Sequence, residues 1–257
     1  MPLPLPPTRP NMRTLYQFPI SHYCEKTRWH LDHKGLAYQV DNLFPGLHRL
    51  TTRRIAGIDT LPVLRDADRV IGDSTRIALY LEEHYPQRPL LPADARQRAE
   101  VLELEERFDR LGVHVRRWLY GQIRQWDSLM HAMLHVYPPL LGLRDLSKPL
   151  LIGTLKRLYG VTPPRVARSQ AELLDCLALI EARIDNDPGR YLVGDRLSLA
   201  DVSAAALLAP LFTPAGTPWA GVCGYDDASA EFVAHLHERP AGQWVMRRYD
   251  EDRNPHP

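Results

Sequence analysis

The chain has 257 residues, of which 44% are apolar, so it is long enough to bury one large core or two ordinary ones. Its formal net charge is +1 at pH 7, and its lysines and arginines are spread along the sequence, so we expect no nucleic acid partner. The three cysteines, Cys24, Cys176 and Cys223, are odd in number and far apart. This pattern argues against a disulfide framework or a metal knuckle and favours a reducing, cytoplasmic compartment.

Two stretches resemble targeting or membrane segments. Residues 1–11 alternate proline with other residues, which predicts an extended, poorly ordered tail rather than a signal peptide. Residues 203–225 carry no charge and are long enough to span a bilayer. However, Pro210, Pro214 and Pro218 would break backbone hydrogen bonds that lipid cannot replace. We therefore expect no membrane partner and a buried helix that runs into a loop.

The first third of the chain alternates strand and helix signals. Residues 13–18 predict a strand, residues 25–34 a helix that Gly35 ends, and residues 37–43 a second strand. This βαβ order favours two parallel strands. After an arginine-rich loop, residues 61–66 and 69–73 predict two more strands that turn at Ala67 and Asp68, and residues 74–86 predict a helix. The order is therefore βαβ followed by ββα.

Only helix signals follow residue 92. Residues 94–126 have apolar side chains at helical spacing and predict one long helix. Ser169 with Glu172, and Ser198 with Asp201, each have the spacing of a capping box at a helix start. We therefore predict an α/β domain at residues 12–86, a linker at 87–93 and an all-helical domain at 94–253.

Four motifs carry a resemblance to a known family. They are "SHYCEKTRWHLDHKG" from Ser21, "TLPVL" around Pro62, "GDSTRIALYLEE" around Asp73 and Ser74, and "YLVGDRLSLADV" from Tyr191. In this order and at this spacing, residues 12–250 resemble the cytosolic glutathione transferase superfamily, and the first motif is similar to those of the omega and tau classes. The resemblance implies a thioredoxin-like domain followed by a helical domain, and a dimeric detoxification enzyme.

The resemblance also implies roles for individual residues. Ser21 stands at the position of the catalytic cysteine or serine, and Pro62 at the family's cis-proline, where the Leu61 backbone pairs with the cysteinyl unit of glutathione. Asp73 and Ser74 match the pair that holds the γ-glutamyl end. Arg53 or Arg54, of which we favour Arg54, would bind the glycine carboxylate. The sequence departs from the family here, because "AGIDT" replaces the usual Asn-Pro-x-Gly before the proline.

The chemistry of the residues themselves agrees with a thiolate site at Ser21. A helix N-terminus stabilises an anion, and a serine hydroxyl there can donate a hydrogen bond to a sulfur. A free thiol with a pKa of about 8.5 would otherwise be mostly protonated at neutral pH. The alternative for Ser21 is an ordinary N-cap. N-capping is also the alternative for Asp73 and Ser74, and a trans proline that opens an edge strand is the alternative for Pro62.

Cys24 offers a different chemistry. Ser21 and Cys24 have the spacing of a C-x-x-C redox motif whose first cysteine is replaced by serine. A first-turn cysteine could still form a mixed disulfide with glutathione, which would make the protein a thiol reductase. Alternatively, Cys24 is a small buried hydrophobe.

Other candidates give weaker signals. Strand alternation turns Tyr16 away from the site, with Gln17 at the position where some classes of the family carry a catalytic tyrosine. The arginines of the long helix, Arg116 and Arg117 among them, predict a solvated face or a contact with an anionic substrate. His131 and His135 are one helical turn apart, but no third ligand is evident, so we predict no metal.

We therefore predict a glutathione transferase in which a Ser21-stabilised thiolate of glutathione attacks a small soft electrophile. Trp118 and Tyr120 are candidate walls of the second-substrate pocket, and the unusually long connection at residues 127–165 is a candidate cover. One alternative is a glutathione-dependent isomerase or thiol reductase that uses Cys24. Another is a non-catalytic binding or scaffold protein with the same fold.

Overall fold

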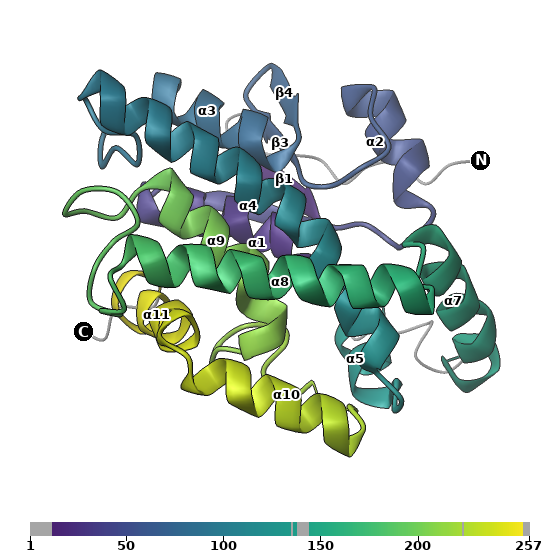
Figure 1. Ribbon diagram of the computed structural model, residues 1–257. Coiled ribbons are helices and arrows are strands. Elements are labelled where there is room, and N and C mark those ends of the chain that lie inside the picture. The colour runs from purple at the N-terminus through teal and green to yellow at the C-terminus, as the bar shows by residue number, and fades with distance from the viewer. Residues whose placement is uncertain (1–11, 135, 138–143, 223, 254–257) are drawn as a thin grey trace. The chain divides into compact units, whose positions relative to one another are not determined.

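A computed structural model describes residues 12–134, 136–137, 144–222 and 224–253 (Figure 1). It divides into two compact units, Met1–Arg88 and Pro89–Pro257. The first unit is thioredoxin-like, with helices around a small mixed sheet, and the second is helical. The predicted fold class is therefore confirmed.

The first unit follows the predicted βαβ-ββα order. Its four-stranded sheet has the order β2-β1-β3-β4, in which β1 and β2 are parallel and the other neighbours are antiparallel. Its elements are β1 (Arg13–Gln17), α1 (His22–His33), β2 (Tyr38–Asn42), α2 (His48–Ala56), β3 (Val63–Asp66), β4 (Arg69–Gly72) and α3 (Ser74–His84).

Two helices of this unit differ from the prediction. Helix α1 begins at His22, three residues before the predicted start at Glu25, because Ser21 is its N-cap. Helix α2 lies where we predicted only a loop. Only Thr52 of α2 is buried, so the helix has no apolar stripe in its sequence that could have signalled it.

Helices α1 and α3 pack on the sheet through an apolar cluster and a buried ionic network. The cluster is formed by Leu15, Leu31, Leu64, Ile77 and Leu81. Beside it, Glu82 of α3 accepts contacts from His30 Nε2 at 3.0 Å and Lys34 Nζ at 2.8 Å. Burial by itself would raise the pKa of Glu82, but these two partners bring it down to about 2. The carboxylate is therefore ionised in the folded protein.

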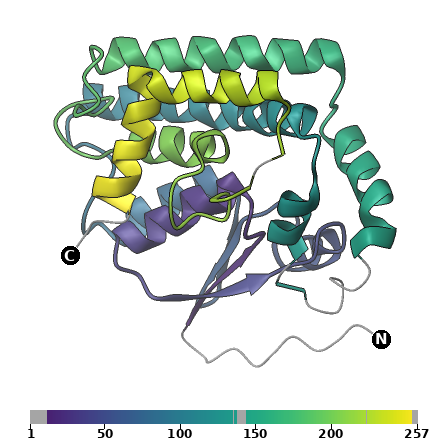
Figure 2. The same ribbon diagram turned by 90° about the horizontal axis from the view of Figure 1, so that it is seen from below.

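The second unit is built around the two long helices α4 and α8. Helix α9 is buried along its whole length and packs against α4, and Figures 1 and 2 show α8 running alongside α4. The elements are α4 (Ala95–Gln122), α5 (Asp127–Leu134), α7 (Arg144–Leu158), α8 (Pro163–Arg183), α9 (Leu199–Phe212), α10 (Asp227–Glu238), α11 (Pro240–Arg248) and the π-helix η1 (Tyr249–Arg253).

One of the two predicted capping boxes is present in the structure and the other is not. The predicted capping box at Ser169 is wrong, because α8 already begins at Pro163. Ser169 lies within α8, and its side chain is buried. The Ser198–Asp201 capping box is confirmed at the start of α9. Pro210 does not end α9, which continues to Phe212. Within the described residues no helix has the length and apolarity needed to cross a membrane.

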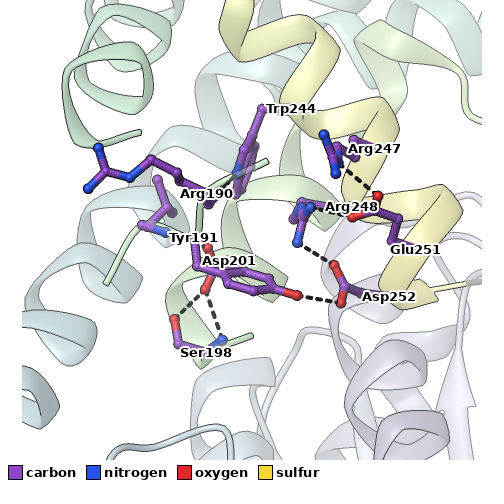
Figure 3. Close-up of polar contacts among 10 residues, drawn as sticks. Arg190, Tyr191, Ser198, Asp201, Trp244, Arg247, Arg248, Glu251 and Asp252 are labelled. Carbon is purple, nitrogen blue, oxygen red and sulfur yellow. Dashed lines mark hydrogen bonds and ion pairs between the residues drawn. The ribbon is translucent and has the colours of Figure 1, made fainter. Parts of the chain in front are cut away.

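A cluster of polar side chains joins the start of α9 to the C-terminal helices (Figure 3). The buried Asp201 carboxylate accepts the Leu192 N–H at 2.8 Å, the Ser198 N–H at 2.8 Å and the Ser198 hydroxyl at 2.6 Å. The fully buried Arg248 pairs with Asp252 at 2.7 Å, and Tyr191 donates to the same carboxylate at 3.0 Å. Residues 191–201 are thus fixed both to α9 and to η1.

Candidate functional site

The sheet register of the first unit brings three connections to one end of the sheet. Tyr16 of β1 lies opposite Val63, the first residue of β3, and Val63 lies opposite Gly72, the last residue of β4. The loop that follows β1, the residues that precede β3 and the turn that follows β4 therefore share this end. These connections carry Ser21, Leu61, Pro62, Asp73 and Ser74, so the structure brings five predicted site residues together.

The Asp73 connection has an unusual backbone. The peptide bond between Leu61 and Pro62 is cis, and the Asp73 N–H donates to the Pro62 carbonyl oxygen at 3.2 Å. Asp73 has φ 78° and ψ 131°, a conformation that costs a non-glycine residue energy and that is enriched at functional sites. Its Oδ1 accepts the N–H groups of Thr75 and Arg76, so the predicted N-cap role is present. Asp73 is exposed, whereas Ser74 is buried.

Ser21 is the N-cap of α1 and is partly exposed. Its Oγ accepts the Cys24 N–H at 3.4 Å, a long hydrogen bond, and the hydroxyl keeps its own proton as a donor. At this position a ligand anion would meet both the hydroxyl and the positive end of α1.

Cys24 is fully buried one turn further along α1. Burial raises the pKa of the Cys24 thiol, and the opposing effects of Ser21 and Arg28 are smaller. A protonated, inaccessible thiol is a poor nucleophile. The structure of the first unit therefore gives Cys24 the properties of a small core residue.

Arg28 was not singled out in the sequence. It donates to Glu25 at 2.8 Å and to the Pro19 carbonyl oxygen at 3.2 Å, and a further hydrogen bond joins it to Gln17. The guanidinium thereby ties the end of β1, the loop that leads to Ser21 and helix α1 together. Its position seven residues after Ser21, on the same face of α1, is the signal that could have identified it.

Helix α2 supplies the two candidate arginines. Arg53 pairs with Asp59, with one contact at 2.7 Å, whereas Arg54 is exposed and forms no ion pair with the described residues. The ring of His48 packs edge-on against Phe18 at 4.7 Å, so the start of α2 lies beside the loop that leads to Ser21. Of the two arginines, only Arg53 is therefore engaged in an ion pair within the described residues.

The comparisons with known proteins agree with this arrangement. The family model described as "Glutathione S-transferase, N-terminal domain" matches residues 15–89. The model described as "Glutathione S-transferase, C-terminal domain" matches residues 163–232, and the two models together cover more than half of the chain. The chain belongs to the glutathione transferase superfamily.

Individual members of this superfamily and proteins similar to them match most of the chain. It is 25% identical to Glutathione S-transferase 1 of Dianthus caryophyllus over 92% of this chain and 94% of that protein. It is 26% identical to the Stringent starvation protein A homolog of Coxiella burnetii over 62% of this chain and 83% of that protein. A solved glutathione S-transferase of Rhodospirillum rubrum matches with 26% identity and a TM-score of 0.57, covering 95% and 96% of the two chains.

The other aromatic side chains considered as site residues of this glutathione transferase family member are buried. Trp118 and Tyr120 are buried in the second unit, where Trp118 packs near Tyr225 and Phe232, and Tyr120 packs near Trp126 and Tyr159. Tyr16 is buried in the first unit. No three His, Cys, Asp or Glu side chains of the described residues could hold a metal ion together, and His135 lies outside those residues.

Proposed function

We propose that this protein is a glutathione transferase whose first unit binds the tripeptide and whose Ser21 hydroxyl stabilises the glutathione thiolate for attack on a soft electrophile. The observation that carries the proposal is the convergence of Ser21, the cis Leu61–Pro62 unit and Asp73–Ser74 at one end of the sheet. Each of these groups complements a different part of one peptide ligand.

The ligand would be held along its backbone and at both ends. Leu61 precedes the cis proline, and its N–H and carbonyl groups can pair with the cysteinyl unit. Asp73 has a second carboxylate oxygen for the ligand's amino group, because only Oδ1 is used by the N-cap. Ser74 and the N-terminus of α3 face the γ-glutamyl carboxylate, and Arg54 binds the glycine carboxylate.

The thiolate mechanism is favoured over the reductase mechanism by the different surroundings of the two side chains. The partly exposed Ser21 hydroxyl can donate to a bound sulfur, whereas the Cys24 thiol is fully buried and its pKa is raised. A Cys24 mixed disulfide would require the first turn of α1 to open.

We also propose a second-substrate pocket and a homodimer. Trp118 and Tyr120 are buried, so they would line a pocket for a small electrophile only if the side chains that pack on them moved. A homodimer with one site in each subunit is expected from the family, and the mass measured by light scattering at micromolar concentration tests it.

Titration calorimetry with glutathione, followed by rate measurements with a generic aryl halide, tests the proposed activity. We expect saturable binding and glutathione-dependent conjugation. The second candidate is a non-catalytic binding or scaffold protein, because the chain is also similar to a Stringent starvation protein A homolog, a protein whose name mentions no transferase. Binding of glutathione without turnover of any electrophile would support that candidate, and absence of binding would support it more strongly.

A further inference from the structure

The turn between α7 and α8 is surrounded by positive charge. Residues 156–168, "KRLYGVTPPRVAR", include Lys156, Arg157, Arg165 and Arg168 and contain no acidic residue. The tip of this turn is the dipeptide Tyr159–Gly160, which follows the last residue of α7.

Two arginines of α4 hold Tyr159 in place. The guanidinium of Arg116 lies over the Tyr159 ring, 3.9 Å from its centroid. Arg117 donates from Nε to the Tyr159 carbonyl oxygen at 3.0 Å and from Nη1 to the Ser169 hydroxyl at 3.3 Å. Because Tyr120 packs on the same ring at 5.4 Å between centroids, the position of Tyr159 is fixed from several sides.

A third guanidinium approaches the same dipeptide from α8. A Cβ atom placed on Gly160 would lie 2.5 Å from Nη1 of Arg165, so this guanidinium rests directly against the glycine. The first turn of α8 comes this close to α4 because Gly121 leaves room for Val166, whose side chain lies 2.7 Å from where a Cβ of Gly121 would be. The guanidinium groups of Arg116, Arg117 and Arg165 therefore gather at Tyr159–Gly160.

Two members of this cluster, Arg117 and Arg165, have no acidic partner among the described residues. Arg165 forms no ion pair with them, and the contacts of Arg117 are a carbonyl and a hydroxyl. Burial lowers the pKa of Arg117, and the neighbouring Arg165, Arg116 and Arg168 lower it further. Arg168, at the outer edge, pairs with Glu172 at 3.6 Å. The positive end of α8 adds to the same potential, and the Thr162 side chain makes no capping hydrogen bond.

We propose that the Tyr159–Gly160 turn is a binding site for a phosphate group, held by Arg117 and Arg165 and bordered by Arg116 and Arg168. A guanidinium matches two oxygens of a phosphate at once, and Nη2 of Arg117 makes no hydrogen bond to the described residues. Two neighbouring guanidinium groups complement a dianion better than the single charge of a carboxylate. The site uses residues of the second unit only and does not depend on glutathione binding.

The test is a titration of the full-length protein with inorganic phosphate at constant ionic strength, maintained with sodium chloride. Amide NMR shifts of residues 159–162, 165 and 166 report the site, and the apparent Tm reports binding to the folded state. O-Phosphoserine is titrated separately, because the group could be free or carried as a monoester. We expect saturable shifts at this turn with at least one of the two compounds, while acetate gives none.

Arg165→Ala and Arg110→Ala form a matched pair, because each removes one exposed positive charge from the second unit. Arg165 makes no hydrogen bond or ion pair with the described residues, whereas Arg110 pairs with Glu106 on α4 at 2.5 Å. Arg165→Ala should raise the half-saturating concentration roughly tenfold, and Arg110→Ala should leave it unchanged. Linear shifts without saturation for both phosphate compounds, or equal weakening by the two variants, would overturn the proposal.

Discussion

The Asp73 N–H and the Pro62 carbonyl oxygen are joined by a hydrogen bond of 3.2 Å. This bond fixes the turn that precedes α3 against Pro62, the residue before β3. Because the two connections are held together, the proposed function requires that glutathione paired with the Leu61 backbone present its neighbouring γ-glutamyl group to Asp73 and Ser74.

Asp73→Asn distinguishes the two roles of the Asp73 side chain, because it removes the negative charge offered to the ligand and keeps the N-cap of α3. Asparagine can accept the Thr75 and Arg76 N–H groups and tolerates positive φ, so the free energy of unfolding should change little. Glutathione affinity should fall roughly tenfold or more, because a charge-assisted hydrogen bond is lost. Calorimetry and a denaturant titration measure the two effects, and unchanged affinity would remove Asp73 from the site.

Ser21→Ala and Cys24→Ala distinguish the two candidate chemistries. If Ser21 donates to the thiolate, Ser21→Ala should raise the pKa of the bound glutathione thiol and slow conjugation roughly tenfold to a thousandfold. Cys24→Ala should leave conjugation nearly intact. Thiolate absorbance titrations and aryl halide rates measure both. Loss of activity only in Cys24→Ala, together with a Cys24 glutathione adduct in the mass spectrum, would establish the reductase mechanism instead.

Arg54→Ala should weaken glutathione binding about tenfold, because the glycine carboxylate loses a cationic partner. Arg53→Ala is the matched control, since Arg53 is already paired with Asp59. Repeating both titrations with glutathione whose glycine carboxyl is amidated completes the cycle. The Arg54 effect should disappear with that ligand, and its persistence would assign Arg54 a different role.

The Glu82 network predicts a pH dependence of stability. The folded pKa of Glu82, about 2, lies below the ordinary value of 4.5, so its contribution is present above about pH 4.5 and is lost as the pH falls toward 2. Glu82→Gln should destabilise the protein at pH 7 by about 3–5 kcal/mol, because Lys34 is left buried without its carboxylate. The difference from wild type should shrink below pH 4 in urea titrations, and a constant difference would contradict the assignment.

Asp201→Ala should destabilise the protein more than Ser198→Ala. The first change leaves the buried Leu192 N–H and Ser198 N–H without their acceptor, and each such loss costs about 1–3 kcal/mol. The second change removes one hydroxyl, worth about 1 kcal/mol at an N-cap. Thermal unfolding of both variants measures the order, and equal destabilisation would show that the hydroxyl carries most of the effect.

The sequence by itself determined the elements that depend on residues close together in the chain. The βαβ-ββα order follows from alternating apolar runs and glycine or proline at their ends, and Gly35, with φ 65°, terminates the first helix as predicted. The Ser198–Asp201 box formed because its partners are three residues apart. The Ser169–Glu172 pattern has the same spacing, yet the helix begins earlier at Pro163, and Ser169 instead contacts His114 and Arg117 of α4.

Only the tertiary structure decided which side chains are exposed and which distant residues meet. The sequence leaves the Ser21 hydroxyl and the Cys24 thiol as competing catalytic groups, and packing distinguishes them by burying Cys24 completely. Arg116 and Arg117 were predicted to form a solvated face or to meet an anionic substrate, and the two long helices place them beside Arg165 at Tyr159–Gly160. Burial and electrostatic potential depend on distances in space, and the positions of charged residues along the sequence do not give those distances.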